Sequence, residues 1–260
     1  MAWDWQIPRV RRGALAVWRR NVMVWRRLLG PAILMNFGEP LIYLLGFGLG
    51  LGVFVGKVAD MSYLAFLASG IVASSAMTTA SFEGMYSVFT RMVPQRTYEA
   101  ILATPLEIDD ILAGEMLWCA SKGLMSGAAI LLVGAGLGVV GGWSALLALP
   151  VVLLIGLTFG GMALIMAALA DNYDFFSYYF VLLITPMLML CGVFFPIDSL
   201  PGWLQTAVQL LPLSHAVELV RPLVVGLPVE QAWLHLLVLS AYALVAYYLA
   251  VVLVRRRLVV

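Results

Sequence analysis

Residues 143–170 read WSALLALPVVLLIGLTFGGMALIMAALA, an apolar run of 28 residues without a charged side chain. A helix of about 20 such residues crosses the hydrocarbon core of a bilayer. The apolar residues follow one another continuously, without the alternation of a membrane β-barrel. Five more stretches meet the length requirement, approximately Pro31–Val55, Tyr63–Phe89, Ile111–Val140, Phe175–Phe195 and Ala232–Val254. We therefore expect an all-α membrane protein with six transmembrane helices.

The composition of the chain argues against the soluble classes of protein. The 260 residues are 63% hydrophobic and 11% charged, and the mean hydropathy is +1.00. Soluble domains are roughly half apolar and about one quarter charged. A soluble enzyme, a nucleic-acid-binding module and a disordered scaffold are all disfavoured. Cys119 and Cys191 both lie in apolar surroundings, and His215 and His235 are isolated, so neither a disulfide framework nor a metal site is expected.

Basic residues indicate how the chain is oriented in the membrane. Twelve of the 15 Lys and Arg residues lie in the N-terminal segment, in the loop after the second run, or at the C-terminus, which six spans place on one side. Lys57 and Arg221 fall on the other side, and Lys122 lies within the third run. Cytoplasmic loops carry an excess of Lys and Arg. We expect both termini in the cytoplasm.

Residues 1–30 form a segment distinct from the membrane domain, residues 31–260. Apolar side chains recur there at helical spacing and are bordered by arginines: Leu15, Trp18, Val22, Trp25 and Leu29. Tryptophan beside arginine on an amphipathic helix suits the headgroup layer of a membrane. The sequence predicts a basic interfacial helix along the inner membrane face. The alternative is a basic tail that serves only to set the topology.

The inner loop, residues 95–106, mixes charged and apolar residues densely. Pro94 ends the preceding helix, and Pro105 disfavours helical geometry at Thr104. Between them, Gln95–Ala103 can form a short helix that docks into a groove on a soluble partner. A solvated connection is the equally weighted alternative. The candidate docking residues are Arg96, Tyr98, Glu99, Ile101, Leu102, Thr104 and Pro105.

The outer segment that follows the fifth run is apolar but broken by prolines. Two short helices fit, about Gly202–Leu211 and His215–Val225, with Ser214 as N-cap and Gly226 as terminator. Broken backbone at membrane depth is tolerated where it packs within protein or lines an aqueous cavity. We expect residues 196–226 to form re-entrant or interfacial helices over the outer end of the bundle. An ordinary external loop is the alternative.

Ionisable residues inside the apolar runs are candidates for contact with a substrate. Glu39 and Glu83 both lie about 12 Å from the inner end of their helices. Equal depth on neighbouring helices would form a polar substrate entrance. The favoured alternative places Glu39 at the interface and pairs Glu83 locally. Glu115 and Lys122 are expected to form structural pairs.

No motif for catalysis is present. The chain lacks a G-x-x-x-x-G-K-[ST] sequence, so it is not expected to bind or hydrolyse ATP. Ser126-Gly127 is the nearest candidate for an intramembrane serine hydrolase, but its flanks do not fit. We expect no catalytic residue and no metal or cofactor in this chain.

Three motifs carry a resemblance to a known family. They are Gly38–Gly48 (GEPLIYLLGFG) in the first run, Tyr98–Leu106 (YEAILATPL) in the inner loop, and Phe194–Pro201 (FFPIDSLP) after the fifth run. With the order of basic helix and six spans, the chain resembles the permease subunits of ABC-2-type exporters. It is most similar to the nodulation protein J branch, which is associated with export of lipo-chitooligosaccharides.

The resemblance implies a complete transport system in the bacterial inner membrane. A homodimer of this chain would work with two copies of a separate ABC ATPase, which binds ATP and Mg²⁺, and would export an amphipathic substrate. Residues 95–106 would be the coupling helix. Residues 196–226 would close the exit, and the implied outer gate consists of Phe194, Phe195, Pro196, Pro201 and Trp203.

The alternative function is a secondary transporter or channel that needs no ATPase. Ion-coupled carriers usually place ionisable groups near the membrane midplane, often in repeated halves. The fourth, fifth and sixth runs have none near their centres, which favours the ATP-driven export of a glycolipid, lipo-oligosaccharide, polysaccharide or hydrophobic drug.

Overall fold

The computed structural model describes residues 6–27 and 29–258, with no side-chain detail at residues 29, 31–37, 39 and 40. The N-terminal half comprises α1 (Gly13–Arg26), α2 (Leu29–Gly50), α3 (Gly52–Val55), the hairpin β1 (Lys57–Val58) and β2 (Met61–Ser62), α4 (Tyr63–Phe82), the π-helix η1 (Glu83–Ser87), α5 (Val88–Met92), α6 (Thr97–Leu102) and α7 (Ile108–Gly136).

The C-terminal half continues as η2 (Trp143–Leu147), α8 (Ala148–Leu169), α9 (Phe175–Tyr179), the π-helix η3 (Phe180–Ile184), α10 (Thr185–Leu190), η4 (Ile197–Ser199), α11 (Gly202–Val208), α12 (Pro212–Val225) and α13 (Ala232–Leu258). β1 and β2 pair antiparallel and form the two-stranded sheet of the described chain. Apart from this short hairpin, the regular elements of the described residues are helices, which confirms the expected all-α fold.

Helices long and apolar enough to cross a membrane lie where the sequence predicts four of its runs. They are Tyr63–Met92, Ile108–Gly136, Trp143–Leu169 and Ala232–Leu258. The first and fifth predicted spans are also helical, and their described apolar stretches, Leu41–Val55 and Phe175–Leu190, are shorter. The chain is a membrane protein.

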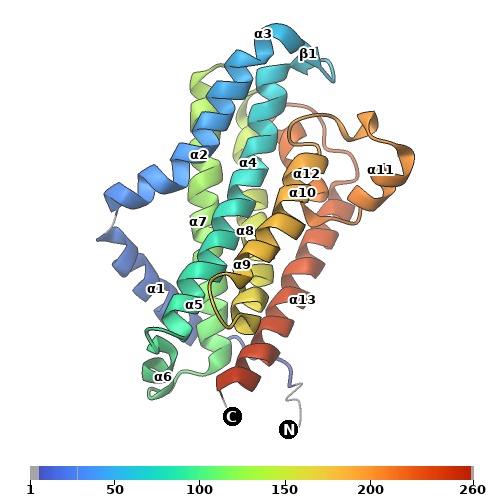
Figure 1. Ribbon diagram of the computed structural model, residues 1–260. Coiled ribbons are helices and arrows are strands. Elements are labelled where there is room, and N and C mark those ends of the chain that lie inside the picture. The colour runs from blue at the N-terminus through green and yellow to red at the C-terminus, as the bar shows by residue number, and fades with distance from the viewer. Residues whose placement is uncertain (1–5, 28, 259–260) are drawn as a thin grey trace.

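The bundle core is built from α4, α7, α8 and α13, which pack against one another side by side (Figure 1). Small residues allow the backbones of α7 and α8 to approach closely. A Cβ added at Gly156 would lie 2.6 Å from the Cα of Ala120, and one at Gly160 would lie 2.7 Å from the Cβ of Cys119. This contact leaves no room for a larger residue in either glycine position.

The two ends of the bundle differ in what they carry. Figure 1 shows α6 and both chain ends together at the bottom, which we call the α6 end. The β1–β2 hairpin and α11 lie toward the opposite end, which we call the hairpin end. At the α6 end, Asp109 at the start of α7 pairs with Arg255 of α13 at 2.7 Å and accepts a hydrogen bond from the Arg9 amide at 2.8 Å. This contact joins the N-terminal segment to both helices.

The helix α1 packs against α7 through Ala14, Val17 and Asn21, whereas the stripe that begins at Leu15 was expected to face the headgroup layer of the membrane. Ala14, Val17 and Asn21 are buried, whereas Leu15 is 56% exposed. The helices approach closely because Gly114 has no side chain: an added Cβ would lie 2.6 Å from the Ala14 carbonyl oxygen. Of the expected stripe, Leu15 faces outward, while Trp18 donates to the Ser121 hydroxyl and Trp25 contacts Trp118, both on α7. The placement of α1 along a membrane surface stays a prediction.

The outer segment forms two helices, as expected, with α11 and α12 bent by 88° at the break between them. Gly226 ends α12 in the left-handed conformation, with φ +86°, as predicted. Ser214 is not the N-cap, because α12 begins at Pro212, whose fixed φ suits a first helical position. The Ser214 hydroxyl instead donates to the carbonyls of Val208 and Leu211, at 2.8 and 2.6 Å.

The fifth predicted span ends earlier than its apolar sequence does. Helix α10 stops at Leu190, and Gly192 turns the chain with φ +78°. Residues 191–195 are therefore irregular, and they carry Phe194 across the hairpin end of the bundle. The apolar pattern alone did not reveal this turn, because its residues are as hydrophobic as the helix before them.

Candidate functional site: a polar cavity closed at one end

A cavity of about 850 Å³ lies between α1, α2, the continuous helix α4–η1–α5, α7 and the helix η3–α10. Its wall follows α4–η1–α5 from Thr78 to Arg91, a length of about 20 Å at the rise of a helix. The cavity reaches the molecular surface, because Val24 and Gln95 in its wall are exposed. The wall is polar toward the α6 end and apolar at Ile184, Leu188 and Met189.

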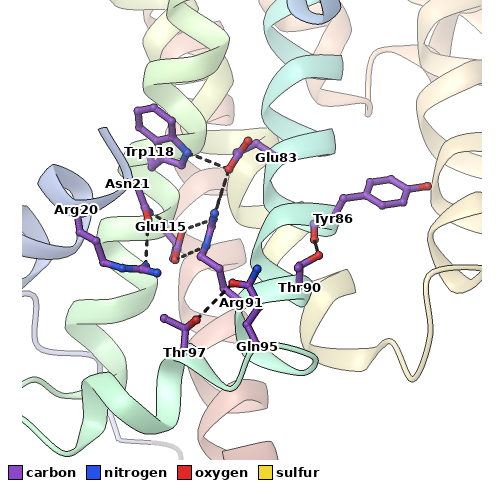
Figure 2. Close-up of polar contacts among 10 residues, drawn as sticks. All are labelled: Arg20, Asn21, Glu83, Tyr86, Thr90, Arg91, Gln95, Thr97, Glu115 and Trp118. Atoms are coloured by element: carbon purple, nitrogen blue, oxygen red, sulfur yellow. Dashed lines mark hydrogen bonds and ion pairs between the residues drawn. The ribbon is translucent and has the colours of Figure 1, made fainter. Parts of the chain in front are cut away.

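An ionic cluster forms the polar wall of this cavity. Arg91 binds Glu115 in a bidentate manner, with Nε to Oε1 at 3.0 Å and Nη2 to Oε2 at 2.7 Å. Its guanidinium also lies 3.4 Å from Oε1 of Glu83, and Figure 2 shows Arg91 between the two carboxylates. Glu115 is fully buried, and its charge is held there because Arg91 neutralises it.

Neutral donors complete the cluster from two other helix positions. Asn21 of α1 donates its side-chain amide to Glu115 at 2.8 Å. Trp118 of α7 donates its indole N–H to Glu83 at 2.9 Å (Figure 2). The cluster thus ties α1, α7 and the η1–α5 segment together at one point. The favoured sequence interpretation of Glu83, a local pair, agrees with these contacts, and Glu83 also lines the cavity.

Both π-helical segments of the described chain contribute to the cavity wall. Residues of η1 include Glu83 and Tyr86, and residues of η3 include Phe180 and Ile184. Phe82, the last residue of α4, connects the two segments: its ring stacks on Tyr86 of η1 with centroids 4.4 Å apart and meets the ring of Phe180 of η3 at 6.3 Å. π-helical turns are rare and occur frequently at functional sites, because they re-aim side chains within a helix.

Aromatic side chains close the cavity toward the hairpin end. Phe194 makes edge contacts with Tyr43 and Phe47 of α2, at centroid distances of 6.2 and 5.8 Å. Beneath Phe194 a small space of about 30 Å³ shares Tyr43, Thr78 and Leu188 with the main cavity. Phe194 therefore lines a small space that adjoins the cavity at Tyr43, Thr78 and Leu188.

Arg221 of α12 holds the turn that carries Phe194. Its Nη2 donates to the Gly192 carbonyl at 2.5 Å, and its Nε donates to the Ser69 hydroxyl at 3.2 Å. The guanidinium also lies 3.7 Å from the ring centroid of Phe66 in α4. Arg221 thereby connects α12, α4 and residues 191–195.

The other predicted outer-gate residues do not line the cavity. Trp203 is 73% exposed and Pro201 is exposed, both at the start of α11. Phe195 and Pro196 are half-buried and lie beyond Phe194 along the turn. Four of the five residues belong to the FFPIDSLP motif and Trp203 follows it, but they extend from the turn at residues 191–195 to the start of α11. Of this set, Phe194 is the residue next to the cavity, in the wall of the small space that adjoins it.

The predicted docking residues divide into an exposed and a buried set. Arg96, Glu99, Thr104 and Pro105 are exposed, while Ile101 and Leu102 are half-buried against the bundle. Tyr98 is a correction, since its side chain is fully buried within the chain's own core. Burial raises the pKa of the Tyr98 hydroxyl well above its ordinary value. Tyr98 therefore anchors α6, which spans six residues and begins after Arg96 in the left-handed conformation.

Only one half of the predicted substrate entrance can be described. Glu83 lies in the cavity wall, as stated above. The side chain of Glu39 lies outside the described residues. Residues that sequence reasoning missed are Asn21, Tyr43 and Trp118, which line the cavity from three helices. The signal for Asn21 was a lone amide in an amphipathic helix. Tyr43 belongs to the first of the three family motifs, but no role was assigned to it, and Trp118 resembles an ordinary membrane aromatic.

Comparison with known proteins identifies the family to which the chain belongs. A family model described as ABC-2 type transporter matches residues 12–225. The chain belongs to the ABC-2 type transporter family. It is thus the membrane subunit of a transporter and not itself catalytic, and its family in general works with an ABC ATPase.

Two relatives match nearly the whole chain, and a third matches most of it. A nodulation protein J of Rhizobium meliloti (strain 1021) is 46% identical over 98% of this chain and 94% of its own length. Another, of Rhizobium leguminosarum bv. trifolii, is 48% identical over 94% and 93%. An inner membrane transport permease, YadH of Escherichia coli (strain K12), is 26% identical over 78% of each chain. The resemblance seen in the sequence motifs is confirmed.

Proposed function

We propose that this chain is the permease subunit of an ATP-driven exporter that moves an amphipathic substrate out across the bacterial inner membrane. The observation that carries the proposal is the asymmetric cavity. Its wall is polar toward the α6 end, and Phe194 packs on Tyr43 and Phe47 toward the hairpin end. A cavity of this form admits cargo from one side and blocks the other.

The lining supports an amphipathic cargo. Charged groups gather at the α6 end, while aromatic and aliphatic side chains line the part toward Leu188. A polar head and an apolar tail of one molecule can therefore lie along the same wall. Glycolipid, lipo-oligosaccharide, polysaccharide and hydrophobic drug all remain within the proposal.

The energy source is proposed to be a separate ABC ATPase, two copies of which act on a homodimer of this chain with ATP and Mg²⁺. The exposed residues of the 95–106 segment lie at the α6 end, where both termini also lie and where a cytoplasmic partner would dock (Figure 1). Exposed apolar side chains flank the cavity, including Phe82 at 49% and Met189 at 42%. They support a second copy facing the cavity. ATP binding then favours one of two conformations, which requires different contacts with the ATPase in each.

Charge reversal on α6 tests the docking proposal. Glu99→Lys changes an exposed residue that forms a weak pair with Arg96 at 3.9 Å, so the fold is expected to survive. We expect at least a tenfold loss of ATPase co-purified with the permease, since the lysine would place a positive charge opposite partner groups that suit a carboxylate. Glu230→Lys, an exposed position outside α6, is the matched control and should retain the partner. Equal recovery of ATPase with both variants would refute docking through Glu99.

Transport in reconstituted vesicles separates the two functional alternatives. The permease and its ATPase together are expected to move a lipid-linked cargo only when ATP and Mg²⁺ are present. The permease alone is expected to move none. Full transport by the permease alone, without nucleotide, would instead support a secondary transporter or channel.

A further inference from the structure

Lys122 stands out among the charged groups of the cavity. It lies on α7, lines the cavity wall and is 7% exposed. Within the described part of the chain, its ammonium makes no hydrogen bond and no ion pair. Its recorded contacts are with two indole rings, Trp25 with the ring centroid 5.6 Å from Nζ and Trp118 at 6.0 Å. The expected structural pairing of Lys122 is thus not formed.

The nearby carboxylates are already occupied by other donors. Glu83 accepts from Trp118 and lies beside Arg91, and Glu115 accepts from both Arg91 and Asn21. Neither carboxylate lies within ion-pair distance of Lys122. The positive charge of Lys122 therefore lies against aromatic faces in the cavity wall, beyond ion-pair distance of these carboxylates.

A second hydrogen-bond donor next to Lys122 also lacks an acceptor. The indole Nε1 of Trp25 is buried without a hydrogen-bond partner in the described chain. An ammonium carries three donors and no acceptor, and an indole N–H donates only. Buried polar groups are almost always hydrogen-bonded in folded proteins. The two groups together require an acceptor that the described side chains do not supply.

The charge of the wall selects among possible acceptors. Among the described side chains that line the cavity, Arg20, Arg91 and Lys122 are basic, and Glu83 is acidic. Glu115, buried behind the wall, pairs with Arg91, so the three basic and two acidic groups leave an excess of one positive charge. A neutral hydroxyl or amide could satisfy the donors but would leave this excess of positive charge. An anionic oxygen group satisfies both requirements, since charge-assisted hydrogen bonds to an ammonium are strong.

We propose that Lys122 and Trp25 bind the phosphate or carboxylate group of an amphipathic molecule held in the cavity. The inference deepens the exporter proposal and rests on it, because it assigns the polar part of the cargo to a defined position. The apolar wall at Ile184, Leu188 and Met189 then receives the acyl part of the same molecule. Trp25 acts as a positioning and donor group, and Lys122 determines the preference for an anion.

The test uses two lipids that differ only in the phosphate group. The purified full-length protein in a neutral detergent is titrated with dioleoyl phosphatidic acid or with dioleoylglycerol, and bound lipid is counted by native mass spectrometry. We expect the wild-type protein to bind phosphatidic acid at least about tenfold more tightly, as one charge-assisted hydrogen bond contributes. Equal binding of the two lipids would overturn the proposal without the need for any variant.

Variants assign the preference to the two residues. Lys122→Gln should abolish the preference for phosphatidic acid, Lys122→Arg should keep most of it, and Trp25→Phe, which retains the ring and removes the N–H, should weaken it several-fold. Lys57→Gln removes an exposed lysine at the β1–β2 hairpin and is the matched control, with wild-type binding. A wild-type preference in Lys122→Gln would overturn the assignment.

A competition arm identifies the source of the anion. Excess inorganic phosphate should leave phosphatidic acid bound, because the apolar wall adds affinity for the lipid. Complete displacement would overturn the assignment to an amphipathic ligand and indicate a site for free phosphate. No step uses ATP or an ATPase, so failure here leaves the exporter proposal standing, and loss of ATPase co-purification leaves this site standing.

Discussion

The guanidinium of Arg91 determines whether two carboxylates can remain charged inside the bundle. Its side chain is 14% exposed, and the side chains of its partners Glu83 and Glu115 are 12% and 0% exposed. Removing one partner from a buried ion pair leaves the other charge without compensation, which is far more costly than losing the pair as a whole. Stability at this position therefore depends on the arginine more than on either acid.

Arg91→Met is expected to lower the free energy of unfolding by about 3–5 kcal/mol, because it leaves both carboxylates unpaired. Arg91→Lys should recover part of the loss, since an ammonium cannot bind Glu115 in a bidentate manner. Denaturation by SDS from mixed micelles measures the difference. Arg19→Met, an exposed arginine of α1, is the control and should change stability little. An unchanged unfolding curve for Arg91→Met would show that the cluster does not stabilise the fold.

Spacing along the chain reveals contacts within one helix but not contacts between helices. Glu83 and Arg91 belong to one helical stretch, so their proximity was open to prediction, and a local pair for Glu83 was the favoured interpretation. The partners Asn21 and Glu115 lie on α1 and α7, 94 residues apart in sequence. A single sequence gives helix faces but not the rotation that brings two faces together, so the composition of the cluster emerged only from the packing.

At the scale of elements, the helices were predictable and their interruptions were not. Charge, length and apolar periodicity placed α4, α7, α8 and α13 and the break between α11 and α12. The π-helical turns η1 (EGMYS) and η3 (FVLLI) have no sequence signal of this kind, because residues of the same types also occur in the regular membrane helices of this chain. They depend on tertiary contacts such as that of Tyr86 with Phe176, whose ring centroids lie 5.0 Å apart. Such contacts stabilise the side-chain directions that the π-helical turns produce.

Arg221 is expected to hold the turn at residues 191–195 closed. Arg221→Met removes the hydrogen bonds to the Gly192 carbonyl and the Ser69 hydroxyl, each charge-assisted and worth about 1.5–3 kcal/mol. Local opening of the turn should then become at least about tenfold more frequent. Cys191 reports this, because its side chain is fully buried next to Gly192. The measurement is the rate of Cys191 labelling by a membrane-permeant maleimide in a Cys119→Ala background.

The control for this experiment is another arginine with a similar set of partners. Arg257 donates to the carbonyls of Ala167, Ala168 and Ala170 at the opposite, α6 end of the bundle. Arg257→Met should leave Cys191 labelling at the rate of the parent protein. Acceleration by both substitutions would indicate general loosening of the bundle and contradict a specific role for Arg221.

At the scale of the whole molecule, the charge distribution and the fold agree. The sequence places twelve basic residues on the predicted inner side, and the structure brings the N-terminal segment, α6 and the end of α13 to one end (Figure 1). These charges also serve the fold, because Arg255 and Arg11 pair with Asp109 and Glu107 around the start of α7. The cavity could not be predicted in the same way, since it depends on the positions in which α1, α2 and η3–α10 pack against the core.

Orientation in the membrane is the whole-molecule property on which the exporter proposal depends, and single cysteines can report it. In a Cys119→Ala, Cys191→Ala background, Lys57→Cys marks the exposed hairpin and Thr104→Cys marks the exposed part of the 95–106 segment. In spheroplasts, which retain an intact inner membrane, a membrane-impermeant maleimide should label Lys57→Cys and should reach Thr104→Cys only after the membrane is permeabilised, because an excess of Lys and Arg keeps the α6 end inside. The reverse pattern would turn the cavity toward the cell exterior and put α6 beyond the reach of a cytoplasmic ATPase. Export would then be impossible by the proposed route, whereas the fold and the ionic cluster would be unaffected.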